Sequence, residues 1–124
     1  MSLEIAIRYA KQNKIRPKGR NSISRFCAYL TNGRSHFRGF NSYRTSPLQA
    51  KYSKGTDNPE RICTHAEVQA IVKAVRKGKV TDFKDYTMYI ARVLADGTPS
   101  IARPCESCWA ALTEFRINDV HWTE

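Results

Sequence analysis

Thr64-His65-Ala66-Glu67-Val68 opens the most regular helical pattern in the chain, and the rest of the sequence is organised around it. Apolar residues recur at positions 68, 71, 72 and 75, the spacing of one helix face. A second segment, Pro104-Cys105-Glu106-Ser107-Cys108, begins another helical pattern that ends near Phe115. The sequence therefore predicts helices over 64–77 and 104–115, each starting at a segment of polar and sulfur-containing side chains.

Periodicity and turn signals place the remaining elements. Asn32-Gly33 is a favoured dipeptide for a two-residue hairpin turn, and the near-continuous apolar run at 86–94 is typical of a central strand covered on both faces. A basic loop is expected at 15–20, where Pro17 and Gly19 break regular structure. The other predictions are a helix over 2–14, strands over 25–30, 35–40 and 120–122, and an irregular segment at 41–61 with some helix at 47–52.

The order of these elements predicts the fold class. The last strand, helix and strand imply a parallel pair joined by a right-handed crossover, whereas the hairpin supplies antiparallel strands. We therefore expect an α/β fold with three layers, α/β/α, around a mixed sheet of about four strands. Residues 1–124 are expected to form a single domain.

Composition and charge narrow the class of protein further. Hydrophobic residues make up 41% of the 124, enough for a buried core. No apolar run approaches the ~18 residues that span a membrane, and the N-terminus lacks a signal-peptide layout, which indicates a cytoplasmic protein without a membrane partner. Residues 1–54 carry twelve Lys and Arg against one acid, whereas 55–124 carry nine against ten. This asymmetry favours a phosphorylated or polyanionic partner, and a solvated basic face is the alternative.

Three side chains from the two quoted segments could bind zinc. His65 offers an imidazole, and Cys105 and Cys108 lie three positions apart, so they share one helix face. A helix N-terminus lowers the pKa of a thiol, and the thiolate is the form that binds metal. Three ligands are typical of a catalytic zinc site, which leaves a fourth position for water. The other cysteines, Cys27 and Cys63, are predicted to be small buried thiols.

Glu67 fits two roles. Zinc brings the pKa of a bound water toward 7, and Glu67 could carry that proton to a leaving group. Alternatively, Thr64 and Glu67 form a capping box, in which the carboxylate accepts from the Thr64 backbone N–H. The three ligands could also belong to a closed structural site, with Cys63 or His121 as the fourth. The complete ligand set beside a spare carboxylate favours the catalytic role.

These motifs resemble the cytidine and deoxycytidylate deaminase superfamily, which also includes deaminases of polynucleotides. His65-Ala66-Glu67 and Pro104-Cys105-Glu106-Ser107-Cys108 match its H-x-E and P-C-x-x-C signatures. Gly39-Phe40-Asn41 matches a weaker G-x-N pattern of the family. The expected order of elements agrees with the family across nearly the whole chain.

The resemblance implies a cytidine-deaminase-like fold, a Zn²⁺ cofactor and Glu67 as the catalytic residue. It also implies that Asn41 contacts the sugar or base of the substrate and that the Ala66 backbone N–H contacts the pyrimidine carbonyl. Relatives often form dimers or larger assemblies, so the resemblance further implies a homo-oligomer.

Three functions follow from these observations. The preferred one is an enzyme that deaminates cytosine to uracil in a nucleoside or nucleotide such as dCMP, a reaction of pyrimidine nucleotide metabolism. Its sugar and phosphate would be held by Asn41 and by arginines of the basic half and of the loop before the second motif, namely Arg38, Arg44, Arg92 and Arg103. The second is a deaminase of a base within single-stranded DNA or RNA, favoured by the basic half and its interleaved aromatics. The third, a zinc-stabilised nucleic-acid-binding module without catalysis, gives no role to Glu67.

Overall fold

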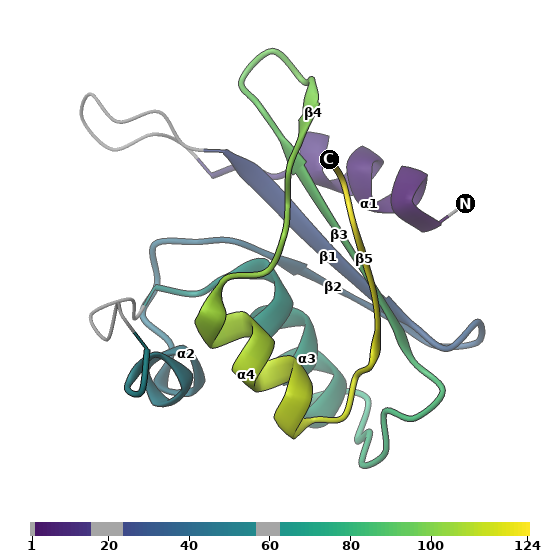
Figure 1. Cartoon of the computed structure of the whole chain (residues 1–124). Helices are drawn as coiled ribbons and strands as arrows, with labels where there is room; N and C mark the ends of the chain where they lie inside the picture. The colour runs from purple at the N-terminus through teal and green to yellow at the C-terminus, as the bar shows by residue number, and fades with distance from the viewer. Residues whose placement is uncertain (1, 16–23, 57–62) are drawn as a thin grey trace.

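The computed structural model describes residues 2–15, 24–56 and 63–124 as a mixed sheet between helices (Figure 1). The expected α/β class is confirmed. Apart from Ile15, the basic loop expected at 15–20 lies outside the described residues, as does the end of the irregular segment, 57–62. The elements are α1 (Ser2–Lys11), β1 (Arg25–Thr31), β2 (His36–Phe40), α2 (Pro47–Ser53), α3 (Ala66–Arg76), β3 (Thr87–Val93), β4 (Pro99–Ser100), α4 (Glu106–Glu114) and β5 (Asp119–Trp122).

The sheet has β3 near its centre. Strand β1 pairs antiparallel with β2 on one side and with β3 on the other. Both β4 and β5 pair with β3, β4 antiparallel and β5 parallel. The antiparallel hairpin and the parallel β3–β5 pair are therefore confirmed, and the two-residue strand β4 raises the strand number from about four to five.

Helices cover both faces of this sheet, which makes three layers (Figure 1). On one face α1 packs against alternate residues of β1 and β3, including Ala91 and Val93. On the other face α3 and α4 pack against Met88 and Ile90, which are fully buried. The run at 86–94 is apolar on both faces because its side chains enter two separate cores. Among the described helices, none is long and apolar enough to cross a membrane.

A glycine lets β2 lie directly on α3. A Cβ at Gly39 would come within 2.1 Å of the Ala66 carbonyl oxygen and 2.5 Å of the Ala70 nitrogen. Neither atom can move away, because both belong to the helix backbone. The glycine of the G-x-N segment thus fixes the start of α3 against β2, and β2 leads straight to Asn41.

The hairpin loop differs from the predicted two-residue turn. It spans four residues, 32–35, because Thr31 pairs with His36. The Asn32 side-chain oxygen accepts from the backbone N–H groups of Arg34 and Ser35, at 2.9 and 2.7 Å. Gly33 has a φ of 91°, whereas Asn32 does not have a positive φ. The asparagine therefore acts through its side chain, as in an Asx turn.

Helix α3 ends close to the position predicted from the sequence, where Gly78 was expected to stop it. The left-handed conformation that ends the helix is adopted by the next residue, Lys79, with a φ of 56°. The Val80 N–H then donates to the Ala74 carbonyl at 3.0 Å, a typical helix-ending bond. Gly78 is needed for space, since a Cβ there would lie 2.2 Å from the Phe37 ring.

Candidate active site and metal centre

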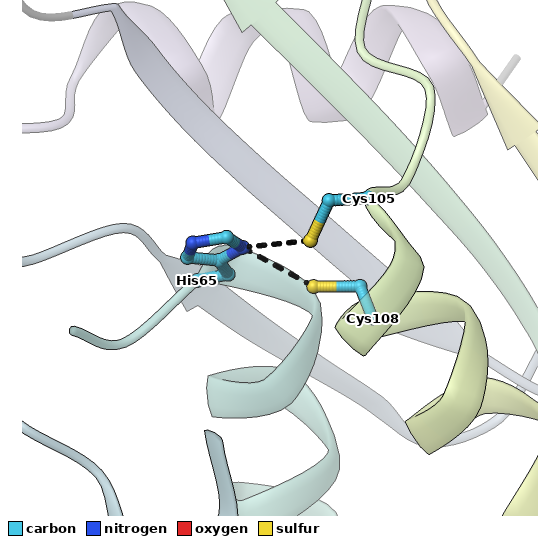
Figure 2. A group of neighbouring side chains, drawn as sticks. All are labelled: His65, Cys105 and Cys108. Atoms are coloured by element: carbon cyan, nitrogen blue, oxygen red, sulfur yellow. Dashed lines mark hydrogen bonds between the residues drawn. The ribbon is translucent and has the colours of Figure 1, made fainter. Parts of the chain in front are cut away.

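The three predicted metal ligands converge where α3 and α4 begin (Figure 2). His65 Nδ1 lies 3.4 Å from Cys105 Sγ and 3.3 Å from Cys108 Sγ, and all three ligand atoms lie within 4.8 Å of one another. Tetrahedral zinc at its usual bond lengths holds nitrogen and sulfur ligands about 3.6 Å apart. The cluster therefore fits Zn²⁺ in donor type and in spacing.

Two of these ligands occupy helix N-caps. His65 and Cys105 have extended backbones before α3 and α4, and neither side chain caps its own helix. An N-cap side chain usually accepts from an N–H group of the first turn. Here both side chains turn toward the shared cluster instead. The positive ends of two helix dipoles consequently meet at the thiols and favour negative charge there.

The two cysteine sulfurs of the cluster differ in how readily they lose a proton. Contacts from the Cys108 thiol, the His65 ring and the Ser107 hydroxyl lower the pKa of Cys105 to about 3. The contact with Cys105 and burial raise the pKa of Cys108 well above its usual value. Without a metal the pair thus shares one proton, and a bound cation that displaced it would hold both sulfurs as thiolates.

Glu67 lies beside this cluster, in the first turn of α3. Its side chain is only 5% exposed, and burial raises the pKa of its carboxyl above the usual range. The alternative role of Glu67, in a capping box with Thr64, is excluded, because His65 is the N-cap of α3 and the Thr64 N–H donates to the Arg44 carbonyl at 2.8 Å. Thr64 also donates its hydroxyl to the Arg44 carbonyl at 2.9 Å. The capping box with Thr64 therefore does not explain the burial of Glu67.

A cavity of about 370 Å³ opens onto the cluster. His65, Ala66, Glu67 and Cys105 form the part nearest the metal ligands. Its remaining walls combine apolar, amide and cationic side chains, from Phe26, Asn41, Arg92, Ile101 and Arg103. Mixed apolar and polar walls are typical of a small-molecule site, and the two arginines favour a negatively charged group.

Asn41 lines the cavity and also joins three segments. Its side-chain oxygen accepts from the Phe26 backbone N–H at 3.0 Å and from the Asn13 side chain at 2.7 Å. Its amide nitrogen donates to the Ser24 carbonyl at 3.0 Å. These bonds fix the orientation of the Asn41 amide at the cavity wall and tie it to the end of α1 and the start of β1.

The four predicted arginines fall into two groups. Arg92 and Arg103 line the cavity, and Arg92 is anchored by a 2.9 Å bond from Nε to Ser24 Oγ. Arg38 lies on the other face of the sheet, where its guanidinium sits 4.3 Å from the centre of the Tyr9 ring. Arg44 is exposed and contributes a backbone carbonyl rather than a cavity wall.

Neither proposed fourth ligand joins the cluster. Among the described residues, the metal-binding group consists of His65, Cys105 and Cys108. His121 lies on β5, where it bonds Asp119 at 2.8 Å. Cys63 is exposed, so its prediction as a buried thiol is wrong, whereas Cys27 is fully buried as predicted. An incomplete set of three ligands is the arrangement of an open, catalytic site.

Sequence reasoning missed the residues that line the cavity or support the cluster without belonging to a motif. Phe26 and Ile101 reach the cavity from the start of β1 and from the loop after β4. Gln49, fully buried on α2, contacts the ligand segments. The only available signal was the helical spacing at 47–52, which places Gln49 on α2 but does not indicate its neighbours.

The fold and the site together define a class: an α/β domain with a three-ligand zinc site and a buried carboxylate beside it. A family model described as the cytidine and deoxycytidylate deaminase zinc-binding region matches residues 2–124. The chain therefore belongs to this family, and Zn²⁺ is its metal. Comparisons with curated proteins and with solved structures gave no match.

Proposed function

We propose that the chain catalyses the hydrolytic deamination of cytosine to uracil in a nucleotide such as dCMP or in the corresponding nucleoside. The observation that carries this proposal is the position of Glu67, a buried carboxylate in the wall of a cavity that also contains two zinc ligands. A structural zinc site has no need of such a carboxylate, and burying a carboxylate is costly. A binding module without catalysis would leave it unexplained.

Glu67 would carry protons through the reaction. When bound, zinc supplies a Lewis acid that makes a water nucleophilic near neutral pH. Glu67 takes a proton from the attacking water as the new C–O bond forms at the amino-bearing ring carbon, and delivers it to the adjacent ring nitrogen. The remaining proton of the new hydroxyl group then passes through Glu67 to the amino group, so that the C–N bond breaks, ammonia leaves and the ring carbonyl forms. Its burial and the raised pKa support this role, because the carboxyl then holds a proton more readily than an exposed glutamate.

The walls of the cavity would orient the substrate. The Ala66 backbone N–H lies at the positive start of α3 and can donate to the ring carbonyl. Asn41 is held by its neighbours at the cavity wall, where it would contact the sugar. Arg92 and Arg103 supply the cationic wall that favours a nucleotide over a nucleoside. Arg38 and Arg44 lie outside this cavity, and any contact they make would be with a longer or more distant part of the substrate.

A base within single-stranded DNA or RNA is the second candidate substrate. The observation that favours it is Ile101, which lines the cavity and is still 52% exposed. An exposed apolar side chain at a cavity mouth can pack against a base next to the reacting one, and the basic half of the sequence suits a polynucleotide backbone. Self-association, implied by the family resemblance, stays a prediction.

Replacing Glu67 with Gln tests the proposed mechanism. The amide has the same shape but cannot carry protons, so we expect Glu67→Gln to bind zinc as the wild type does and to lose at least ~100-fold in turnover. Cytosine-to-uracil conversion and zinc content are measured on the same preparation. Glu114→Gln is the matched control, because Glu114 is exposed and pairs with Lys51 at 3.3 Å. Turnover retained by Glu67→Gln would exclude the carboxylate from the reaction.

A further inference from the structure

Gln49 stands out as a fully buried amide with no part in either family motif. It lies on α2, which packs beside α4 (Figure 1). The Ser46 hydroxyl caps α2 by accepting from the Gln49 backbone N–H at 3.3 Å, and Pro47 occupies the first turn. This local structure fixes where the Gln49 side chain leaves the helix, and it directs that side chain toward the zinc ligands.

The Gln49 amide meets both ligand segments at once. Its oxygen accepts from the His65 backbone N–H at 3.1 Å. Its nitrogen donates to Ser107 Oγ at 3.0 Å and lies 3.9 Å from Cys108 Sγ. The orientation of the amide is fixed, because a backbone N–H can only donate and must therefore face the amide oxygen.

The third ligand is reached through Ser107. Ser107 is 2% exposed, and its Oγ lies 3.2 Å from Cys105 Sγ. Because this oxygen accepts a hydrogen from Gln49, its own hydrogen is free to point at Cys105 Sγ. One amide thus influences all three ligands, by direct contact with His65 and Cys108 and through a hydroxyl to Cys105.

We propose that Gln49 is a positioning residue that orients the zinc ligands and supplies hydrogen bonds to both thiolates. Two thiolates in a buried site need donors, and an uncharged amide supplies them without adding a charge. Partners that orient metal ligands typically contribute a factor of 10–100 to metal affinity. The inference rests on the zinc site of the proposed function and is independent of its substrate.

Gln49→Glu separates positioning from packing. The glutamate has the same shape and keeps the oxygen that accepts from His65, but it replaces the donor facing Ser107 and Cys108 by an oxygen. We expect its affinity for Zn²⁺, measured by competition with a chromophoric chelator, to fall by about 10–100-fold. Gln69→Glu is the matched control, because the Gln69 oxygen accepts from the Phe40 N–H at 2.7 Å and the same charge is added away from the sulfurs. Its affinity should stay within about twofold of wild type.

Cobalt absorption gives a second measurement, because the bands of bound Co²⁺ report on ligand geometry and on sulfur donation. We expect Gln49→Glu to shift these bands and Gln69→Glu to leave them unchanged. Ser107→Ala, a smaller change, should shift them as well and lower zinc affinity less than Gln49→Glu does, so the inference remains testable if Gln49→Glu does not fold.

The outcomes distinguish the two proposals. Wild-type affinity and wild-type cobalt bands in both Gln49→Glu and Ser107→Ala would overturn the role of Gln49 and leave the deaminase proposal intact. A wild-type protein that binds neither Zn²⁺ nor Co²⁺ would overturn both.

Discussion

At the residue scale, the four cysteines show how environment divides one residue type into separate roles. Burial raises the pKa of the Cys27 thiol to about 12, although Arg38 and Lys73 nearby partly oppose this. Cys105 and Cys108 lie in the metal cluster, where a bound cation would mask them. Cys63 is exposed, and its backbone forms an isolated β-bridge with Thr45. The rate at which each thiol reacts should therefore depend on its burial and on whether it binds metal.

This division predicts the thiol chemistry of the zinc-loaded protein. A disulfide-exchange reagent should modify Cys63 rapidly and the other three thiols slowly, because Cys27 is buried and the other two bind metal. The rate of thiol release, followed by absorbance, measures this directly. Cys63→Ser should lack the fast phase, while Cys27→Ser should keep it. A fast phase that persists in Cys63→Ser would contradict the exposure assigned to that residue.

The sequence predicted the metal cluster, with Glu67 beside it, because the two segments match the H-x-E and P-C-x-x-C signatures. Cys105 and Cys108 share a helix face at any position in a fold, and the two motifs come from helix starts. Gln49 could not be found in this way, since its contacts with His65 and Ser107 depend on how α2 packs against α4. The same reason explains why Arg38 and Arg44 were predicted as substrate contacts although they lie outside the cavity. Their charge is evident in the sequence, whereas their distance from the cavity depends on the fold.

At the element scale, the contact between β2 and α3 positions the site. The helix start carries His65 and Glu67, and the strand end leads to Asn41, so both sides of the cavity depend on this contact. Gly39 permits it, because a Cβ would overlap the helix backbone. The G-x-N segment therefore has two roles: Gly39 allows β2 to pack on α3, and Asn41 lines the cavity.

Gly39→Ala should destabilise the protein for this reason. The added Cβ would lie 2.1 Å from the Ala66 carbonyl oxygen, so strand and helix must separate. We expect the free energy of unfolding, measured by chemical denaturation, to fall by about 1–3 kcal/mol or more. Gly55→Ala is the control, because nothing lies within 4 Å of a Cβ there, and its effect should stay within about 0.5 kcal/mol. Equal stability of the two variants would contradict the close packing of β2 on α3.

Element types were predictable, whereas their ends and turns were less so. Periodicity identified the helices at 64–77 and 104–115, which the structure shortens to Ala66–Arg76 and Glu106–Glu114. The N-cap positions shift because zinc ligands, and not capping side chains, occupy the helix starts. At the other end of α3, Lys79 takes the left-handed conformation that glycine usually adopts, which composition alone does not reveal.

At the scale of the whole molecule, the sheet gathers distant segments around one cavity. Phe26 lies near the start of β1, Asn41 follows β2, and Arg92 lies near the end of β3. The metal ligands lie at the starts of α3 and α4. Helix α1 packs on the opposite face and is tied to the cavity wall through Asn13. Both faces of the sheet thus contribute, one by carrying the metal ligands and the other by fixing Asn41.

The most direct test of the central claim is a deamination assay of the zinc-loaded protein on a panel of cytosine compounds. Cytidine, deoxycytidine, CMP, dCMP and a cytosine-containing single-stranded oligonucleotide are incubated with wild type, and uracil products and ammonia are measured. We predict equal release of uracil and ammonia, fastest from the nucleotides because Arg92 and Arg103 line the cavity. Conversion of the oligonucleotide alone would replace the nucleotide by the second candidate substrate. A protein that holds zinc and yet releases neither uracil nor ammonia from any of these compounds would contradict the account.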